Sequence, residues 1–201
     1  MIHADLHIHT VYSSDSVIQP KTLVDMLASS SFVKVAAVTD HDSVRGCRAT
    51  VELASAYSDV LIIPGVEITT TLGDILVLGT DELPAKPWTP EATVDFAKAV
   101  DAVSIVAHPF RLYGMGDIAA KYNVDAIEVL NGGSTAAENN EAKNFAKSLK
   151  LPGTAGSDAH QISDLFSVYN RIDADLNVDS VLRAIKRGNV SAQKATGSIH
   201  F

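Results

Sequence analysis

The chain of 201 residues contains a single cysteine, Cys47, so no disulfide can form within it. It also lacks an apolar run near the roughly 20 residues that a membrane-spanning helix needs, and a proline interrupts the run at 60–66. The first residues show no basic segment followed by an apolar one, and Asp5, His7 and His9 stand where a leader peptide is apolar. We therefore expect a soluble, cytoplasmic protein that has no membrane partner.

Basic residues are few, since 16 Lys and Arg stand against 24 Asp and Glu and the formal net charge is −8. They form no cluster, whereas proteins that follow duplex nucleic acid need clustered positive charge to neutralise its phosphates. The sequence therefore argues against duplex nucleic acid as a partner. A small anionic ligand stays open, because a local positive centre such as a metal ion can hold it.

The overall composition is that of a folded globular chain, with 46% hydrophobic and 20% charged residues. No linker rich in Pro, Gly or Ser divides the chain, and neither a low-complexity tract nor a repeat of fixed period is present. A chain of this length can bury one sizeable core. We expect a single compact domain over residues 1–201.

Short β-branched apolar runs alternate with segments of helical spacing along the chain. The runs that predict strands lie at 2–6, 33–39, 60–66, 75–79, 103–107, 124–130 and 152–156. The segments that predict helices lie at 21–29, 44–57, 90–100, 136–149 and 178–187. Thr89 is expected to cap the helix that begins at Pro90. This alternation predicts an α/β protein with a mostly parallel sheet, open or closed into a barrel smaller than the eight-fold one of about 250 residues.

Metal-competent side chains follow nearly every predicted strand. Five of the seven histidines stand at such ends, and they are His7, His9, His41, His108 and His160. In parallel α/β folds the carboxyl ends of the strands meet at one edge, where functional sites are built. The two imidazoles of a His-x-His pair also share one face of a strand. We therefore expect these side chains to converge.

Simpler interpretations exist for each motif taken alone. A lone histidine at a strand end is more often structural, and Glu67 after Pro-Gly could cap the following segment. Asp40 and Asp42 could likewise cap the predicted helix that follows them. The set as a whole favours metal, because imidazole and carboxylate groups suit Zn, Mn or Fe. Without cations, burying so many acids together would cost several kcal/mol, so we expect two or three divalent metal ions.

Five motifs carry a resemblance to a known family. They are Asp-Leu-His-Ile-His-Thr at 5–10, Thr-Asp-His-Asp at 39–42, Pro-Gly-Val-Glu at 64–67, Ala-His-Pro-Phe-Arg at 107–111 and Gly-Ser-Asp-Ala-His at 156–160. In this order they resemble the PHP (polymerase and histidinol phosphatase) superfamily of metal-dependent phosphoesterases. The resemblance covers most of the chain.

The resemblance implies a distorted (β/α)7-type barrel with a trinuclear metal centre at the carboxyl ends of its strands. By residue-to-residue similarity, the ligands of the first ion are His7, His9, Glu67 and Asp158. Glu67 is expected to bridge to a second ion, which also takes His108.

The same resemblance assigns Asp15, His41 and His160 to a third ion. Asp5 and Asp40 resemble partners that orient imidazoles more than direct ligands. Either Asp40 or His160 is a candidate catalytic acid for the leaving group.

At one position the chain departs from the family pattern. Members often carry a histidine as the remaining ligand of the second ion, and this chain offers Asn131. Asn131 could therefore be a weaker oxygen ligand, or it could hydrogen-bond substrate or cap the turn at Gly132 and Gly133. Arg111 is a candidate substrate-binding residue, because a guanidinium matches phosphate oxygens with two hydrogen bonds; the simpler interpretation is a surface arginine.

The activity implied is that of a hydrolase, a phosphatase or phosphodiesterase in which metal ions activate a hydroxide for attack on phosphorus. The expected substrate is a small phosphorylated metabolite, a nucleotide or a short oligonucleotide. Two alternatives remain open at this point. One is an amidohydrolase-type carbon–nitrogen hydrolase, although such sites often use a bridging lysine where this chain has Glu67. The other is a non-catalytic module that binds metal.

Overall fold

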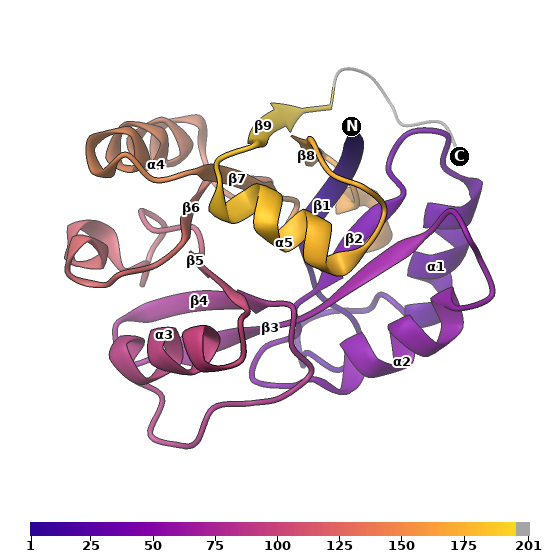
Figure 1. Ribbon diagram of the computed structural model, residues 1–201, viewed down its shortest axis with the longest axis horizontal. Helices are drawn as coiled ribbons and strands as arrows, with labels where there is room; N and C mark the ends of the chain where they lie inside the picture. Colours follow the sequence, from indigo (N-terminus) through magenta and orange to yellow (C-terminus); the bar gives the residue numbers. More distant parts are fainter. Residues whose placement is uncertain (196–201) are drawn as a thin grey trace.

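A twisted sheet of nine strands forms the framework of the computed structural model, which describes residues 1–195 (Figure 1). The strands are β1 (Ile2–Ile8), β2 (Val35–Val38), β3 (Leu61–Thr70), β4 (Gly73–Leu78), β5 (Val103–Val106), β6 (Ala126–Asn131), β7 (Gly153–Gly156), β8 (Val168–Ile172) and β9 (Val190–Lys194). Their order in the sheet is β7-β6-β5-β4-β3-β2-β1-β8-β9. All seven predicted strands are present, whereas β8 and β9 were not predicted. Residues 196–201 of the expected domain lie outside the described part.

The sheet is mixed rather than mostly parallel, because β4 and β8 run against the other strands and four of its eight strand pairs are antiparallel. Parallel pairs join β1 to β2, β2 to β3, β5 to β6 and β6 to β7. Strand β4 runs antiparallel to both of its neighbours, because it returns from β3 through a tight hairpin. The start of β4 therefore lies at the same edge as the carboxyl ends of the parallel strands.

Five α-helices occupy the predicted segments, namely α1 (Pro20–Ser29), α2 (Arg45–Ala54), α3 (Pro90–Ala99), α4 (Ala136–Leu149) and α5 (Val178–Lys186). Two short 3-10 helices, η1 (Gly116–Lys121) and η2 (Ile162–Asp164), lie in the loops after β5 and β7. Thr89 caps α3 as predicted, since its side chain accepts a hydrogen bond from the backbone N–H of Ala92. Within residues 1–195, no helix combines the length and apolarity required for a membrane span.

Buried apolar side chains form two layers. The inner layer lies between the strands and α5 and includes Leu6, Ile63 and Ile105. The outer layer lies between the sheet and the helices α1, α2 and α3. Helix α5 crosses the sheet in Figure 1 and packs on the edge opposite to the carboxyl ends, where Leu182 contacts Gly79 directly after β4. One end of the barrel is thus filled, and the other end is left for polar residues.

The barrel closes where the end of β1 meets the segment after β7. The backbone N–H of Asp158 donates to the carbonyl of His7 at 2.8 Å, and the N–H of His9 donates to the carbonyl of Ala159 at 3.0 Å. These contacts confirm the expected α/β architecture, a distorted (β/α)7-type barrel, to which β8 and β9 add a hairpin beside β1.

A second contact between β1 and β7 comes from Asn170 of β8, whose side chain is fully buried. Its Oδ1 accepts from the backbone N–H of Ala155 at 2.8 Å, and its Nδ2 donates to the carbonyls of Ala155 and Ala4 at 2.6 and 3.1 Å. The amide thus joins β7 to β1, which are not paired neighbours in the strand order of the sheet. A side chain, and not a backbone ladder, completes the barrel here.

We predict that Asn170→Ala lowers the free energy of unfolding by about 3 kcal/mol, because it leaves one buried N–H and two buried carbonyls without partners. Urea denaturation checks this value. The control is Arg171→Ala, an exposed neighbour on the same strand, which should change stability by no more than about 0.5 kcal/mol. Equal stability of Asn170→Ala and the wild type would contradict a structural role for the amide.

Candidate metal centre

Four buried donor side chains meet at the carboxyl ends of the strands. They are His7, His9, Glu67 and Asp158. The Nε2 atoms of His7 and His9 lie 3.0 Å apart, and they lie 3.0 and 3.1 Å from Oε2 of Glu67. Oδ1 of Asp158 lies 3.4 Å from Nε2 of His7 and 3.2 Å from Nε2 of His9. The structure thus brings together the four residues predicted for the first ion.

The spacing of these four atoms fits a metal ion better than it fits hydrogen bonds alone. Ligands at about 2.0–2.2 Å from one ion lie about 2.8–3.6 Å from one another in tetrahedral or octahedral geometry. The observed separations of 3.0–3.4 Å fall in this range. In addition, two imidazole nitrogens face each other, and a shared cation satisfies both lone pairs. The donor set therefore fits a divalent metal ion.

The pKa values of the same side chains show how strongly the site favours positive charge. Burial alone would lower the pKa of His9, but the hydrogen bonds that its ring donates to Asp158 and Glu67 raise it to about 9. Burial would raise the pKa of Asp158, but the positive charge on His7 and the bond from His9 hold it well below its usual range. Without metal, protons on the imidazoles balance the buried carboxylates, and a divalent cation can take over that role.

Glu128 of β6 orients the ring of His7, although the sequence analysis assigned it no role. Its Oε1 accepts from Nδ1 of His7 at 3.0 Å. Its Oε2 accepts from the backbone N–H of His108 at 2.8 Å and from Nδ2 of Asn131 at 3.0 Å. Because Nδ1 of His7 carries the donated proton, the lone pair of Nε2 faces the donor cluster. The signal in the sequence was its place near the end of a predicted strand.

Ser13 and Asp40 orient His9 in a similar way. Nδ1 of His9 lies 3.1 Å from Oγ of Ser13, which in turn donates to Oδ1 of Asp40 at 3.0 Å. Asp40 also accepts from the backbone N–H and the hydroxyl of Thr10 at 2.6 and 2.8 Å. Both oxygens of this buried carboxylate are thus occupied. Its contacts are those of a positioning residue, and the catalytic role for Asp40 stays a prediction.

One alternative interpretation and one expectation about nearby acids are wrong. Neither Asp40 nor Asp42 caps α2, because the residue at its N-terminal cap is Val44 and no side chain donates or accepts there. Asp5 does not orient an imidazole ring. Its carboxylate instead accepts from backbone N–H groups, with Ser157 at 2.9 Å. Burial raises the pKa of Asp5 to about 6, although these hydrogen bonds oppose the shift.

A second donor group contains Glu67, Asp74 and His108. Oε1 of Glu67 lies 3.0 Å from Nε2 of His108, so the two oxygens of this carboxylate face different donor groups. Nδ1 of His108 is buried and has no hydrogen-bond partner within residues 1–195. Asp74 was not predicted, because it stands at the start of a strand. The reversal of β4 brings that start to the same edge as the other donors.

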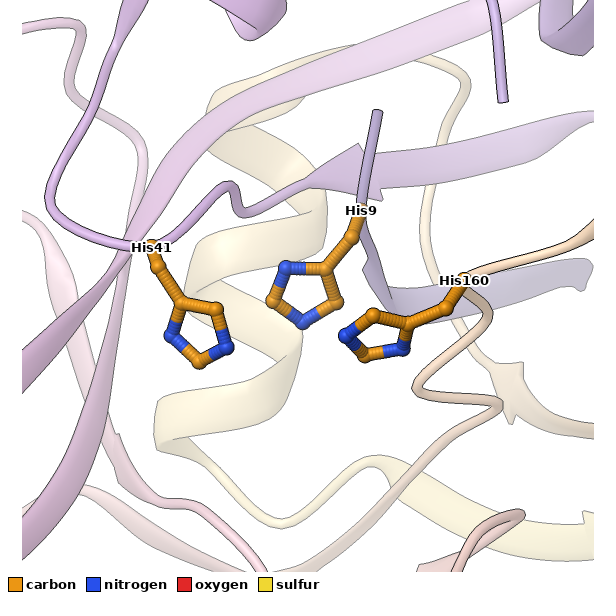
Figure 2. A group of neighbouring side chains, drawn as sticks. All are labelled: His9, His41 and His160. Carbon is orange, nitrogen blue, oxygen red and sulfur yellow. The ribbon is translucent and has the colours of Figure 1, made fainter. Parts of the chain in front are cut away.

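A third donor group contains three histidines from different loops, His9, His41 and His160, whose rings converge in Figure 2. Oδ2 of Asp15 lies 3.3 Å from Nε2 of His160 and 3.7 Å from Nε2 of His41. Nδ1 of His160 lies 2.7 Å from the carbonyl of Asp158, which leaves Nε2 for a ligand. All three residues predicted for a third ion are therefore neighbours.

Asn131 does not contact the second donor group as a ligand. Its Oδ1 accepts from the backbone N–H of Gly133 at 2.9 Å. This bond agrees with the alternative interpretation, in which Asn131 caps the turn at Gly132 and Gly133. Its Nδ2 donates to Oε2 of Glu128 at 3.0 Å and to Oδ2 of Asp158 at 3.3 Å. The interpretation of Asn131 as a metal ligand is therefore replaced by a positioning role, and Asp74 is the additional oxygen donor.

Arg111 lies at the rim of the centre. Its Nη1 donates to Oδ2 of Asp158, on the side away from the imidazoles, and its side chain is 36% exposed. The guanidinium is therefore neither a remote surface group nor a member of the donor cluster. It is in position to meet a ligand that approaches from solvent.

Comparisons with known proteins agree with this architecture. The family model described as PHP-associated matches residues 136–190. A protein of Methanocaldococcus jannaschii that has no assigned function is 34% identical over 140 residues, which span 64% of this chain and 81% of that protein.

Three solved structures share the fold at low sequence identity. PsfC from Pseudomonas syringae has a TM-score of 0.71 at 18% identity, over 96% of this chain and 91% of its own. A candidate metal-dependent phosphoesterase from Bifidobacterium adolescentis has a TM-score of 0.67 at 17% identity, over 94% and 96%. An amidohydrolase from Chromobacterium violaceum, solved with sulfate and without metal, has a TM-score of 0.66 at 15% identity, over 80% and 88%.

The barrel and the donor cluster are those of the metal-dependent hydrolase class, and the cluster offers candidate ligands for divalent metal at the carboxyl ends of the strands. Within that class the chain belongs to the PHP superfamily, as its ordered motifs indicated.

We predict that Glu128→Gln weakens metal binding about 10- to 100-fold. The carboxylate accepts three N–H donors, and a carboxamide can accept with only one of its two terminal atoms. Titration of Mn²⁺ against a competing chelator measures the change. Glu141→Gln, at an exposed position of α4, serves as the matched control and should keep wild-type affinity. If both variants bind equally well, Glu128 does not orient His7.

Proposed function

We propose that the protein hydrolyses a phosphate ester, with a small phosphorylated metabolite, a nucleotide or a short oligonucleotide as substrate. The observation that carries this proposal is the guanidinium of Arg111 at the rim of the donor cluster. A planar, permanent cation next to a metal centre matches the geometry and charge of a phosphoryl group. The sulfate in the neighbour from Chromobacterium violaceum gives further support, because it has the same tetrahedral shape.

Two or three divalent ions, Mn, Zn or Fe, are the proposed cofactors. Bound ions supply a water of lowered pKa and positive charge for the phosphoryl oxygens. The candidate ligands form three groups that share members, since Glu67 belongs to the first and second and His9 to the first and third. Ions bound by these groups would therefore be close neighbours. That arrangement suits a substrate whose attacking and leaving oxygens both need stabilisation.

The remaining roles fall to the residues of the chain. Arg111 binds a phosphoryl oxygen and turns the phosphorus toward the centre, while Glu128 and Ser13 keep the imidazoles of His7 and His9 in place. Water adds to phosphorus, the bond from phosphorus to the leaving oxygen breaks, and the leaving alcohol takes up one proton. One ester and one water thus give a phosphate and an alcohol. The proton donor proposed for that alcohol is His160 or Asp40.

A release assay tests the function. Purified protein loaded with Mn, Zn, Fe or Mg is incubated with phosphomonoesters, phosphodiesters and simple amides, and released phosphate and amine are measured. We expect release of phosphate, loss of activity on chelation, and recovery when metal returns. Cleavage of amides alone would favour a carbon–nitrogen hydrolase, and the absence of all activity with metal bound would favour a non-catalytic module.

We predict that His7→Ala and Asp158→Ala each lower the rate of phosphate release at least about 100-fold, because each removes a donor of the first group. Metal content per chain is measured in the same samples by elemental analysis and should fall with the rate. Wild-type turnover in either variant would mean that the ligand assignment is wrong.

We predict that Arg111→Lys lowers kcat/KM about ten-fold or more despite its positive charge, because an ammonium cannot form two parallel bonds to phosphate. Metal content should remain at the wild-type level, which separates substrate binding from any effect on Asp158. Arg48→Lys is the control, because Arg48 also pairs with an aspartate, Asp81, but on the exposed surface. Unchanged kinetics in both Arg111→Lys and Arg111→Ala would remove Arg111 from the substrate site.

A further inference from the structure

A cavity of about 620 Å³ opens beside the second donor group. Its lining comes from the end of β3, the hairpin to β4 and the loop after β5, and consists of His41, Thr69, Thr70, Thr71, Leu72, Gly73, Asp74, Tyr113 and Gly114. Two of these residues, His41 and Asp74, also belong to the candidate donor groups. The cavity therefore starts at the metal centre and extends away from it. Its volume is that of a site for a small molecule.

Tyr113 is the aromatic residue of this lining, and its side chain is held in solvent. It is 87% exposed, the highest fraction among the large apolar residues of the described chain. Its backbone has φ +66°, a conformation that is unfavourable for a bulky residue and is common at ligand-binding loops. Packing in the hydrophobic core cannot explain the position of this ring, because almost all of its surface is exposed to solvent.

The loop that carries Tyr113 is fixed by backbone hydrogen bonds. The N–H of Arg111 donates to the carbonyl of His108 at 3.1 Å, and the N–H of Gly114 donates to the carbonyl of Arg111 at 2.8 Å. The N–H of Gly116 donates to the carbonyl of Pro109 at 2.7 Å. The ring of Tyr113 therefore stands on a hydrogen-bonded loop that begins at His108 of the second donor group.

The charges of the lining limit what the cavity can hold. Its members that can carry charge near neutral pH are His41 and Asp74, both candidate metal ligands, and it contains neither lysine nor arginine. The rest of the surface is uncharged, with threonine side chains and the apolar Leu72 and Tyr113. Such a surface suits an uncharged, hydroxyl-bearing group with a flat ring. It offers nothing to a second phosphate.

We propose that this cavity binds the leaving group of the substrate and that Tyr113 determines specificity by stacking on a planar ring. The inference rests on the proposed hydrolysis of a phosphate ester and deepens it. The substrate class is a phosphomonoester whose alcohol carries a flat ring and no further charge, as in a nucleoside monophosphate. Arg111 holds the phosphate on one side of the donor cluster, and the alcohol occupies the cavity on the other.

The test compares two phosphomonoesters, AMP and glycerol 3-phosphate, on the metal-loaded full chain. We expect Tyr113→Ala to lower kcat/KM for AMP about ten-fold, mainly through KM, because base–aromatic stacking is lost. Hydrolysis of glycerol 3-phosphate should change little, and Tyr113→Phe should retain the preference for AMP. Leu112→Ala is the matched control, since Leu112 is 81% exposed on the same loop and does not line the cavity.

Equal losses on both esters in Tyr113→Ala, or no loss on AMP, would overturn the assignment. A loss of the same size in Leu112→Ala would also overturn it. If the wild type releases no phosphate from these two esters or from any ester of the panel above, the proposed function fails, and the cavity is then judged by binding alone. Saturation-transfer NMR with adenosine should show contact with the metal-loaded wild type that Tyr113→Ala weakens; absence of contact would refute the cavity as a ring-binding site.

Discussion

Burial of two carboxylates against two imidazoles is the constraint on which the rest of the structure depends. Glu67 and Asp158 face Nε2 of His7 and His9 at 3.0–3.4 Å in a region without solvent exposure. Such groups cost several kcal/mol unless opposite charge compensates them. The barrel therefore delivers them from separate strands to one edge, where a cation can sit between them, and fills the opposite end with apolar side chains of α5.

Hydrogen-bond acceptors on the far side of His7 and His9 fix the orientation of these two metal-competent rings. Nδ1 of His7 is hydrogen-bonded to Glu128. Nδ1 of His9 is hydrogen-bonded to Ser13, which donates in turn to Asp40. The register of β1 shifts between Asp5 and Ile8, and irregularities of this kind re-aim side chains. The rings of His7 and His9 are thus fixed by hydrogen bonds on the side away from the donor cluster. A bound ion then meets lone pairs whose direction the protein has already set.

The sequence predicts much of this molecule because its local and global signals agree. Apolar runs and helical spacing locate β1 to β7 and all five α-helices, and the motif order locates eight metal-competent side chains. Strands β8 and β9 are missed because polar residues such as Asn170 and Arg171 interrupt their apolar pattern. Asp74 is missed for a topological reason. A rule about carboxyl ends of parallel strands cannot find a donor that a hairpin reverses.

The loop after β5 shows how one short segment can couple the parts of such a site. It begins with His108 of the second donor group, continues with Arg111 beside Asp158, and reaches Tyr113 at the cavity. Backbone hydrogen bonds tie it into successive turns, and Gly114 lies so close to the carbonyl of Pro109 that a side chain would collide with it. A shift of this loop would move donor, guanidinium and ring together. Under the proposed function, metal geometry and substrate choice would therefore be coupled, because a single hydrogen-bonded segment carries both sets of residues.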